Sequence, residues 1–390
     1  MLNISDESCC GCSACASKCP KHCITMKTNE EGFLYPFVDT DNCISCGICQ
    51  NVCPILDVDR NQINNLREAW GARTVDKNVL LSSSSGGVFS SLAKKIINEN
   101  GVVFGAAFSD DFQFVHHILI KYIDEIKVLM GSKYIQSEMG DCFFKVKRQL
   151  EMGELVLFSG TPCQIAGLKG FLGKDYDNLF CVDVICHGVP SKYVWQSYCN
   201  SIAKKTGKDI AGVNFRNKRN GWKNYGIELK MNNDNYYYCE ARDDSFLRMF
   251  VNSYCLRDSC YKCEVKNNVV SDITIGDFWG VEKIAPEIED ELGVSLILIH
   301  TPKGKELFEK IKNQLHALEV DYDTAIAHNT AYRDSVKKPP ERDEFYVDLK
   351  ELNWEKMKRK YLDGNIIKVV KRQLSNSALG KLRREIAKKF

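Results

Sequence analysis

The chain has 390 residues, 44% hydrophobic and 27% charged, which suffices for a sizeable core and, at roughly 100–200 residues per domain, for two or three domains. A formal net charge of +2 gives no electrostatic sign of nucleic-acid binding, and no such partner is expected. The 19 cysteines, odd in number and spread along a long chain, exclude a small secreted disulfide scaffold. With neither a signal-peptide pattern nor about 20 consecutive apolar residues, we expect a cytoplasmic protein whose clustered cysteines bind metal or catalyse.

An internal repeat of cysteines occupies the first domain, residues 1–56. The run Cys9, Cys12, Cys15, Cys19 and Pro20 recurs 34 positions later as Cys43, Cys46, Cys49, Cys53 and Pro54. This C-x2-C-x2-C-x3-C-P spacing is typical of bacterial ferredoxins, in which three thiolates of one run bind one 4Fe–4S cubane and the fourth binds the other. The spacing predicts two clusters, held by Cys9, Cys12, Cys15 and Cys53, and by Cys43, Cys46, Cys49 and Cys19.

Structural zinc is the alternative for this domain. Zinc sites usually take their cysteines in two pairs, whereas here a three-plus-one run occurs twice, so we favour the paired cubanes. Cys10 and Cys23 fall outside the spacing and are expected to be non-ligands. The segment 24–38 alternates enough to form short strands around the Glu31-Gly32 turn.

Strands alternate with helices after a polar linker at 57–66. A strand at 68–73 precedes the serine-rich segment 82–87 and a helix from Val88, which Gly101 ends as a C-terminal cap; a buried strand follows at 102–108. A further strand at 155–160 leads to Thr161 as N-cap and Pro162 as first helical residue. This alternation predicts a mixed α/β domain.

The remaining elements continue this pattern towards a basic tail. We expect a strand at 179–185, a helix capped by Ser191, an antiparallel hairpin within 213–238, a strand at 296–300 and a helix at 303–315. His116 and His117 are expected to be an exposed pair on a strand, with no functional role. Residues 350–390 hold 13 lysines and arginines against 4 acidic residues, with Ile366, Val370 and Leu374 at helical spacing. The favoured interpretation is a helical tail, 345–390, packed by one face; peripheral contact with an anionic membrane or an acidic partner is the alternative.

Four cysteines outside the repeat are candidates for a third redox site. Cys260 and Cys263 form a C-x2-C pair, which suits a cluster, zinc or a redox dithiol. Cys163, at a helix N-terminus, is a candidate ligand or reactive thiol, because that position favours the thiolate. Cys186 ends a strand. His187 beside it is a weak candidate for proton transfer, with a structural bond to the backbone as the alternative.

The serine-rich loop has the small residues that allow backbone amides to approach a phosphate at a helix N-terminus. A flexible loop explains the same residues equally well. Neither a G-x-G-x-x-G segment after a strand nor a P-loop is present in the sequence.

Several motifs in order resemble one known family. SSSSGGVFSSLA, GSKYIQS, GTPCQIAGL, ICHGVPS, CYKC and SDITIGDFWG are similar to segments of the beta subunits of deazaflavin-coenzyme (F420) hydrogenases and dehydrogenases, over roughly residues 5–330. The resemblance implies a ferredoxin-like domain followed by the two halves, 67–145 and 150–330, of a mixed α/β flavin-binding domain. It also implies FAD and a third 4Fe–4S cluster, on Cys163, Cys186, Cys260 and Cys263.

The resemblance also suggests residues around the flavin. The residues that would contact the FAD phosphates are Ser85, Gly86, Gly87, Gly160 and Thr161. The residues that would border the flavin ring or its substrate are Lys133, Tyr134, Asp277 and Trp279. Lys133 joins His187 as a weak catalytic candidate. Relatives transfer hydride between a deazaflavin and FAD, and flavins release such electrons singly to clusters.

We therefore expect an iron–sulfur flavoprotein oxidoreductase that exchanges electrons with a redox partner protein or small carrier. The alternatives are a non-catalytic electron-transfer subunit and a zinc-stabilised binding module. Some bacterial members of the family occur among surface-polysaccharide biosynthesis proteins, which adds a redox step in that chemistry to the candidate activities.

Overall fold

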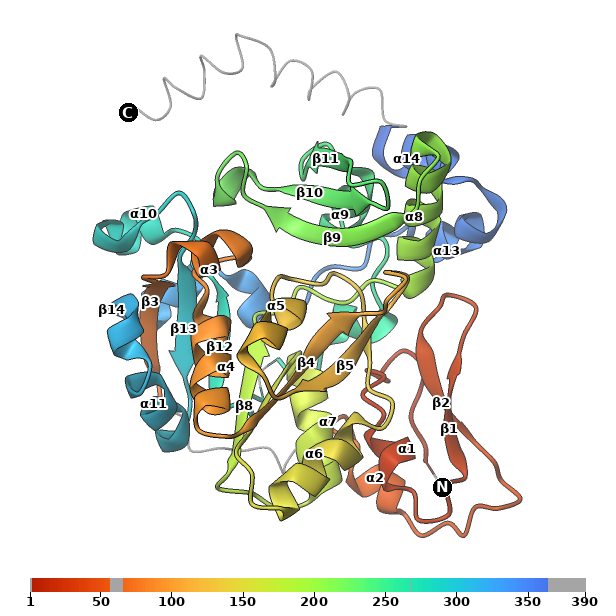
Figure 1. Ribbon diagram of the computed structural model, residues 1–390. Helices are drawn as coiled ribbons and strands as arrows, with labels where there is room; N and C mark the ends of the chain where they lie inside the picture. Colours follow the sequence, from red (N-terminus) through yellow and green to blue (C-terminus); the bar gives the residue numbers. More distant parts are fainter. Residues whose placement is uncertain (1, 57–65, 267, 364–390) are drawn as a thin grey trace.

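A nine-stranded mixed sheet forms the body of the molecule in the computed structural model, which describes residues 2–56, 66–266 and 268–363 (Figure 1). Its strands, in spatial order, are β14 (Leu315–Val320), β3 (Glu68–Thr74), β13 (Ser295–Ile299), β12 (Ile273–Asp277), β8 (Leu179–Val184), β7 (Val156–Gly160), β4 (Val102–Phe108), β5 (Val115–Ile120) and β6 (Ser137–Glu138). Strands β12, β8, β7 and β4 are parallel neighbours, so their carboxyl ends lie at one edge, where α/β folds commonly bind ligands.

Two smaller sheets complete the strand content of the described residues. The first, β1 (Ile24–Thr28) with β2 (Leu34–Val38), is the predicted hairpin of the N-terminal module, and Gly32 has the positive φ of 90° that its turn needs. The second contains β9 (Ile210–Asn217), β10 (Gly226–Met231) and β11 (Tyr236–Glu240), one strand more than the predicted hairpin. Figure 1 shows this second sheet beside one edge of the large sheet.

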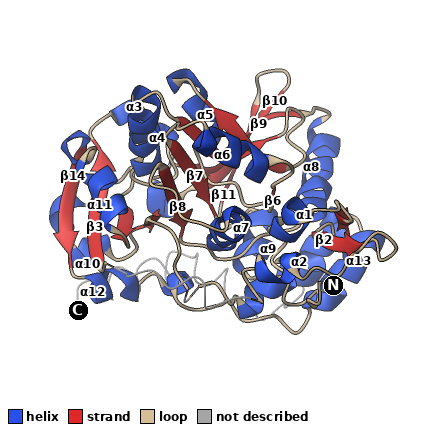
Figure 2. Ribbon diagram, turned by 90° about the horizontal axis from the view of Figure 1, so that it is seen from below, coloured by secondary structure: helices blue, strands red, loops and turns tan. Residues whose placement is uncertain are grey.

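The helices cover the large sheet and link it to the N-terminal module. They are α1 (Ala14–Lys18), α2 (Ile48–Asn51), α3 (Lys77–Ser82), α4 (Val88–Asn98), α5 (Ile126–Leu129), α6 (Cys142–Glu151), α7 (Pro162–Leu172), α8 (Lys192–Thr206), α9 (Ser245–Val251), α10 (Val281–Ile284), α11 (Pro302–Glu309), α12 (Tyr322–Ala327), α13 (Arg342–Glu351) and α14 (Trp354–Lys358). Seen from below, α7 lies next to α1 of the module (Figure 2). None of the helices in the described ranges is long and apolar enough to cross a bilayer.

Most predicted elements are confirmed, with three corrections. The residue with positive φ after α4 is Asn100, at 59°, and not Gly101, which instead packs closely against Ile96 and Leu155. His117, expected from its strand to be exposed, is buried: its ring stacks on Phe158. The predicted helix after β13 ends early, at Glu309, and a short 3-10 turn follows it.

The halves predicted for the α/β domain share one sheet. Strand β3, from the first half, pairs with β13 on one side and with β14 on the other. Of the linker, residues 57–65 lie outside the described residues, as do positions 364–390 of the basic tail with Ile366, Val370 and Leu374.

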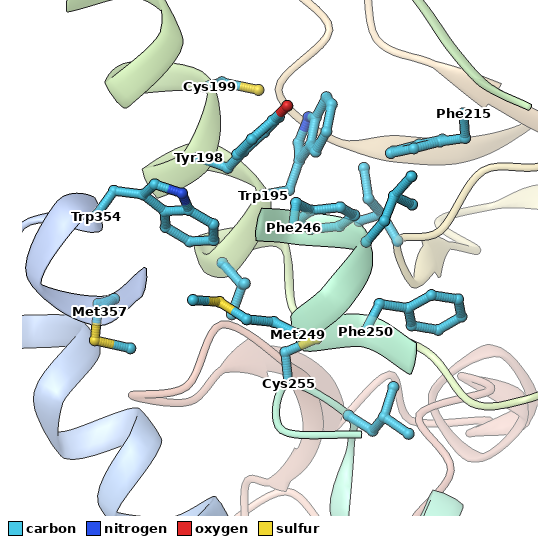
Figure 3. Packing of buried hydrophobic residues seen from close by; sticks show 14 of the residues in the cluster. Trp195, Tyr198, Cys199, Phe215, Phe246, Met249, Phe250, Cys255, Trp354 and Met357 are labelled. Atoms are coloured by element: carbon cyan, nitrogen blue, oxygen red, sulfur yellow. The ribbon is translucent and has the colours of Figure 1, made fainter. Parts of the chain in front are cut away.

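An aromatic core joins the small sheet, the helices and the N-terminal module. Trp195 of α8, Phe215 of β9 and Phe246 of α9 pack against one another, with ring centroids 5.0–5.6 Å apart (Figure 3). The same core includes Phe33 of the module, which contacts Tyr346 of α13. The module's hairpin is therefore part of the core of the body.

Candidate metal centres and the adjoining polar site

The first cysteine run encloses a cavity at the base of the N-terminal module. Its lining includes the four cysteines that the spacing assigns to the first cluster, together with Cys10; the four are Cys9, Cys12, Cys15 and Cys53. Gly11 and Ser13 have φ of 70° and 66°, so the loop turns sharply between its cysteines. Cys53 comes from the second run, as the three-plus-one pattern requires.

The second run encloses a similar cavity on the outer side of the module. It is lined by Cys19, Cys43, Cys46 and Cys49, together with Cys23. Ser45 and Gly47, which are 34 positions after Gly11 and Ser13, also have positive φ, so the sequence repeat is also a backbone repeat. Cys46 is exposed to solvent, which places this cavity at the surface.

A third cavity lies in the body and gathers the four remaining candidate cysteines. Cys163 starts α7, Cys186 follows β8, Cys260 lies in the 3-10 turn 258–262, and Cys263 follows that turn; all four line the cavity. It encloses about 770 Å³, some of it open to solvent, against about 350 and 320 Å³ for the other two. The structure thus brings together the residues that the sequence predicted, and their role as ligands stays a prediction.

The donor set fits an iron–sulfur cluster in all three cavities. Each offers four or more thiols, which is the ligand chemistry of Fe–S clusters; no carboxylate lines the first two cavities, and Asp183 and Glu264 also line the third. Among the residues that the structure describes, no three His, Cys, Asp or Glu side chains are arranged to hold a single metal ion. The thiols surround a space rather than a point, and this favours a cubane over tetrahedral zinc.

The thiols of the third cavity are buried, so their ionised form needs a positive charge nearby to be stable. Burial raises the pKa of Cys186 to about 12, so the free thiol is protonated at neutral pH. Lys266 is buried at the same wall, where its Nζ donates to the carbonyl oxygen of Cys186 at 2.6 Å and to that of Ala331. A bound metal and this lysine would both stabilise the thiolate; no sequence motif singled out Lys266.

The start of α7 is built to hold Cys163 in place. The amide of Thr161 donates to Oε1 of Gln164 at 2.9 Å, and the Thr161 hydroxyl completes a capping box. That hydroxyl is also 3.2 Å from Sγ of Cys163. Thr161, predicted to hold flavin phosphate, is therefore committed to the helix cap and to the cysteine.

His187 connects the third cavity with an aromatic pair. It lines the cavity, its Nε2 is 3.2 Å from Oγ of Ser253, and its ring lies edge-on to Phe250 at 5.0 Å. Phe250 in turn stacks on Tyr134, with centroids 4.7 Å apart. Burial lowers the pKa of His187, so the imidazole is neutral at pH 7.

A polar cluster lies beyond Tyr134, between the large sheet and the β9–β11 sheet. Arg216 of β9 donates to Asp277, the last residue of β12, at 2.8 Å, and its guanidinium lies over the rings of Tyr225 and Trp279. Arg216 is 4% exposed, yet its Nε has no hydrogen-bond partner among the described residues. Buried donors are rarely left unpaired, so this atom suits a polar ligand.

The serine-rich loop reaches the same region through a buried lysine. Nζ of Lys218 donates to the carbonyl oxygens of Ser85 at 2.7 Å and Leu80 at 2.9 Å, and also to that of Leu292. Trp222, near Ser85, stacks on Trp279 at 4.9 Å. Arg216 and Lys218 are therefore surrounded by four predicted residues, namely Tyr134, Ser85, Asp277 and Trp279. Neither cation was predicted from the sequence. The pattern that could have indicated them is two cationic residues, two positions apart, at the end of a strand.

Two of the predicted flavin residues form hydrogen bonds within the protein. Oγ of Ser85 donates to the carbonyl oxygen of Val294 at 2.8 Å, and the amide of Gly86 donates to Oγ of Ser295 at 2.9 Å. A Cβ on Gly86 would lie 2.3 Å from the carbonyl oxygen of Ala72, so this glycine is required by close packing. The Ser85 hydroxyl and the Gly86 amide thus bind the loop to the sheet and are not free for phosphate.

Gly87 and Gly160 lie at the ends of regular elements, and Lys133 bonds to the backbone at the end of α5. Gly87 has φ of 80° as the N-cap of α4, and Gly160 ends β7. Nζ of Lys133 donates to the carbonyl oxygens of residues 129, 130 and 131 at 2.9–3.2 Å, which uses all three donors. Burial lowers its pKa to about 7, and its catalytic role stays a prediction.

Comparisons with known proteins match both parts of the chain. Residues 8–55 match the 4Fe-4S dicluster domain, and residues 153–323 match the family described as the C terminus of the coenzyme F420 hydrogenase/dehydrogenase beta subunit. The F subunit of F(420)H(2) dehydrogenase from Methanosarcina mazei is 21% identical over 334 residues, which cover 81% of this chain and 86% of the relative.

Two further proteins are similar over most of this chain. The coenzyme F420-dependent sulfite reductase of Methanocaldococcus jannaschii is 22% identical over 317 residues, 77% of this chain but only 45% of that protein. A chain of the F420-reducing [NiFe] hydrogenase complex from Methanosarcina barkeri, solved with xenon, covers 76% of this chain and 92% of its own length, at 16% identity and a TM-score of 0.45.

Proposed function

Residues 153–323 belong to the beta-subunit family of coenzyme F420 hydrogenases and dehydrogenases and follow a 4Fe-4S dicluster domain; from this premise we propose that the chain is an iron–sulfur flavoprotein oxidoreductase. The relationship itself supports an iron–sulfur electron-transfer protein of the oxidoreductase type. The proposal adds three 4Fe–4S clusters, FAD in the body, and a redox partner at the N-terminal module. A deazaflavin-type coenzyme is the proposed substrate class, because the names of both curated relatives contain F420.

The observation that carries the proposal is the order of the three cavities. The second opens to solvent beside Cys46, the first lies between it and the body, and the third adjoins the first through Cys10, which lines both. Beyond the third cavity, His187 and Phe250 lead to the polar cluster around Arg216. A row of one-electron sites from the surface to a buried polar site is the arrangement that electron transfer requires.

Two buried arginines hold the module against the body, so the spacing along this row is fixed. Arg257, 0% exposed, donates to the carbonyl oxygens of Cys9 and Leu34 at 2.6 and 3.0 Å, and to Oε1 of Gln136. Arg342 of α13 binds both carboxylate oxygens of Glu31 at 2.5 and 2.6 Å. Bidentate arginine pairs fix geometry as well as energy, which is what a fixed path between sites needs.

The polar cluster is the proposed position for the flavin ring or its substrate. Bound FAD would accept two electrons as hydride and release them singly to the clusters. The free Nε of Arg216 offers a donor to a carbonyl or anionic group, Asp277 orients the guanidinium, and Tyr134 and Trp279 offer aromatic faces. His187, neutral and between this cluster and the third cavity, is the candidate for holding a proton there.

The second candidate function is a non-catalytic electron-transfer subunit. It is favoured by the serine-rich loop, because the hydroxyl of Ser85 and the amide of Gly86 are already bonded within the protein. The curated relative from Methanosarcina mazei is consistent with it, since that protein is named as one subunit of a dehydrogenase. The named relatives give no support to a role in polysaccharide biosynthesis.

Anaerobic purification of the full chain, with analysis of iron, acid-labile sulfide and flavin, separates these functions. About 12 iron atoms per chain with FAD supports the oxidoreductase, at four per cubane, and about 8 to 12 without flavin supports the electron-transfer subunit. Zinc without sulfide contradicts both.

The third cluster has its own test in Cys260→Ser. We expect the variant to lose about a third of the iron, because one of three cubanes loses a ligand. Cys199→Ser is the matched control, since Cys199 is buried in the aromatic core away from all three cavities and should keep its iron. Unchanged iron in Cys260→Ser would contradict the ligand assignment.

A further inference from the structure

Cys10 is surplus to both four-cysteine sets, yet it lies between them. It is 8% exposed and lines the first cavity and the third. Its thiol is near those of Cys12, a predicted ligand of the first cluster, and Cys163, a predicted ligand of the third, and both influence its pKa. The sequence predicted only that Cys10 is not a cluster ligand, and it indicated no other function for this residue.

The close approach of the two cavities depends on one face of α7. Cys163, Gly167 and Gly170 recur at helical spacing and face the module. A Cβ on Gly167 would lie 2.9 Å from Sγ of Cys12, and a Cβ on Gly170 would lie 2.4 Å from the carbonyl oxygen of Val52. Because these two positions carry no side chain, the first cysteine loop packs directly on the helix that holds Cys163.

We propose that Cys10 is a hydrogen-bonding bridge between the first cluster of the module and the cluster of the body, with its thiol shared between the ligand sulfurs of Cys12 and Cys163. The inference rests on the proposed clusters. Iron-bound thiolates can only accept hydrogen bonds, and a thiol placed between two of them can donate its single proton to either one in turn. No bond is formed or broken, and Cys10 keeps its proton while an electron passes between the clusters.

The bridge would act on both clusters because hydrogen bonds to cluster sulfurs influence reduction potentials. Reduction adds negative charge to a cluster, and a donor stabilises that charge, so the thiol raises the potential of each cluster that it contacts. It also supplies a bonded path across the boundary between module and body. Cys10 is thus a positioning and tuning residue and not a ligand.

Cys23 provides a matched comparison within the same chain. It is also buried and surplus, with its Sγ 3.4 Å from that of Cys19, a predicted ligand of the second cluster. However, Cys23 lines the second cavity and neither of the other two. A thiol at Cys23 should therefore influence one cluster, and a thiol at Cys10 should influence two.

The test compares the Cys10→Ala, Cys10→Ser and Cys23→Ala variants of the full chain, purified anaerobically. Iron and sulfide are measured first, and each cluster is then followed by EPR during a potentiometric titration. Signals of the third cluster are identified by their loss in Cys260→Ser. We expect unchanged iron in all three, a shift to more negative potential at the first and third clusters in Cys10→Ala, and partial recovery in Cys10→Ser, whose hydroxyl still donates. Cys23→Ala should shift the second cluster alone.

Two results would overturn the bridge. Loss of about a third of the iron in Cys10→Ala would make Cys10 a ligand, and unchanged potentials at the first and third clusters would show that its thiol contacts neither. Both outcomes are distinct from failure of the proposed function, which the iron, sulfide and flavin content of the unmodified chain decides independently.

Discussion

The N-terminal module and the body bring their cysteines together in opposite ways. In the module, short runs repeated after 34 residues enclose two cavities, and matching residues of the two loops have positive φ. In the body, the third cavity takes its cysteines from the start of α7, from just after β8 and from a 3-10 turn and the residue after it, which together span about 100 residues of sequence. Local spacing therefore encodes the first two sites, whereas the folded sheet encodes the third.

The difference extends to what stabilises each part. Apart from its contacts with the body, the module has a small cluster of buried residues, including Cys19, Cys23, Ile24 and Cys49. The body has large apolar clusters on both faces of its sheet. We therefore expect the module to depend on its predicted clusters and on docking, because a core of this size gives a domain of about 50 residues only marginal stability.

The largest effect is expected from breaking the docking contact. Glu31→Ala would remove the bidentate carboxylate of Arg342, which is 1% exposed, and leave it only longer ion pairs with Asp258 and Asp343, at 3.7 and 3.4 Å. Loss of one partner of a buried ion pair costs about 3 kcal/mol, and the two remaining carboxylates set this as the upper limit here. We expect a lower free energy of unfolding by urea denaturation. Glu30→Ala is the control: its partner Lys350 is exposed, so stability should hardly change. Equal losses in the two variants would show that the docking does not depend on Arg342.

A smaller effect should distinguish the body from the module by pH. Burial lowers the pKa of His117 to about 4, below its value of about 6.5 in the unfolded chain. The folded state therefore binds this proton less readily, and the stability contributed by neutral His117 is complete above pH 6.5 and is lost as pH falls towards 4. At pH 5 the loss is about 2 kcal/mol.

The measurement compares urea denaturation at pH 7 and pH 5 in the unmodified chain and in His117→Gln. The variant should lose less stability than the unmodified chain over this interval, because its amide does not titrate. His22→Gln, at an exposed position of the module, should retain the full dependence. An identical pH dependence in His117→Gln and the unmodified chain would assign the acid sensitivity to other groups.

The smallest effect is expected from a charge at the third cavity. Lys266→Met should shift the potential of the third cluster to a more negative value without loss of iron, because a buried cation stabilises the reduced cluster. The potentials of the module's clusters should stay unchanged. Lys262→Met is the control, since Lys262 is exposed and its charge is screened by water. A shift of equal size in the control would mean that burial of Lys266 is irrelevant.

Local sequence patterns predicted those parts of the fold that are formed by residues close together in the chain. Thr161 and Pro162 indicated the start of α7, and the alternation of strands and helices predicted the mixed α/β class. The end of α4 was misplaced by one residue because Asn, like Gly, tolerates the left-handed region, and Asn100 takes it. Such errors are local and leave the elements intact.

The long-range contacts could not be predicted in the same way. Arg257 and Arg342 lie in no motif, and their partners in the N-terminal module are more than 200 residues away. Arg216 and Lys218 gain importance only because β9 folds over the ends of β12 and the serine-rich loop. From a single sequence, the chemistry of a side chain shows that it needs a hydrogen-bond partner when it is buried. Which residue is that partner can be known only from the folded structure.

The position of β3 constrains how the molecule can form. This strand, made early, remains unpaired in the large sheet until β13 and β14 exist, more than 200 residues later. Contacts so distant in sequence form slowly, and an open strand edge is prone to pair with other chains. A chain shortened before residue 315 would expose one edge of β3, so we expect such fragments to aggregate, even though every cysteine of the three cavities would still be present.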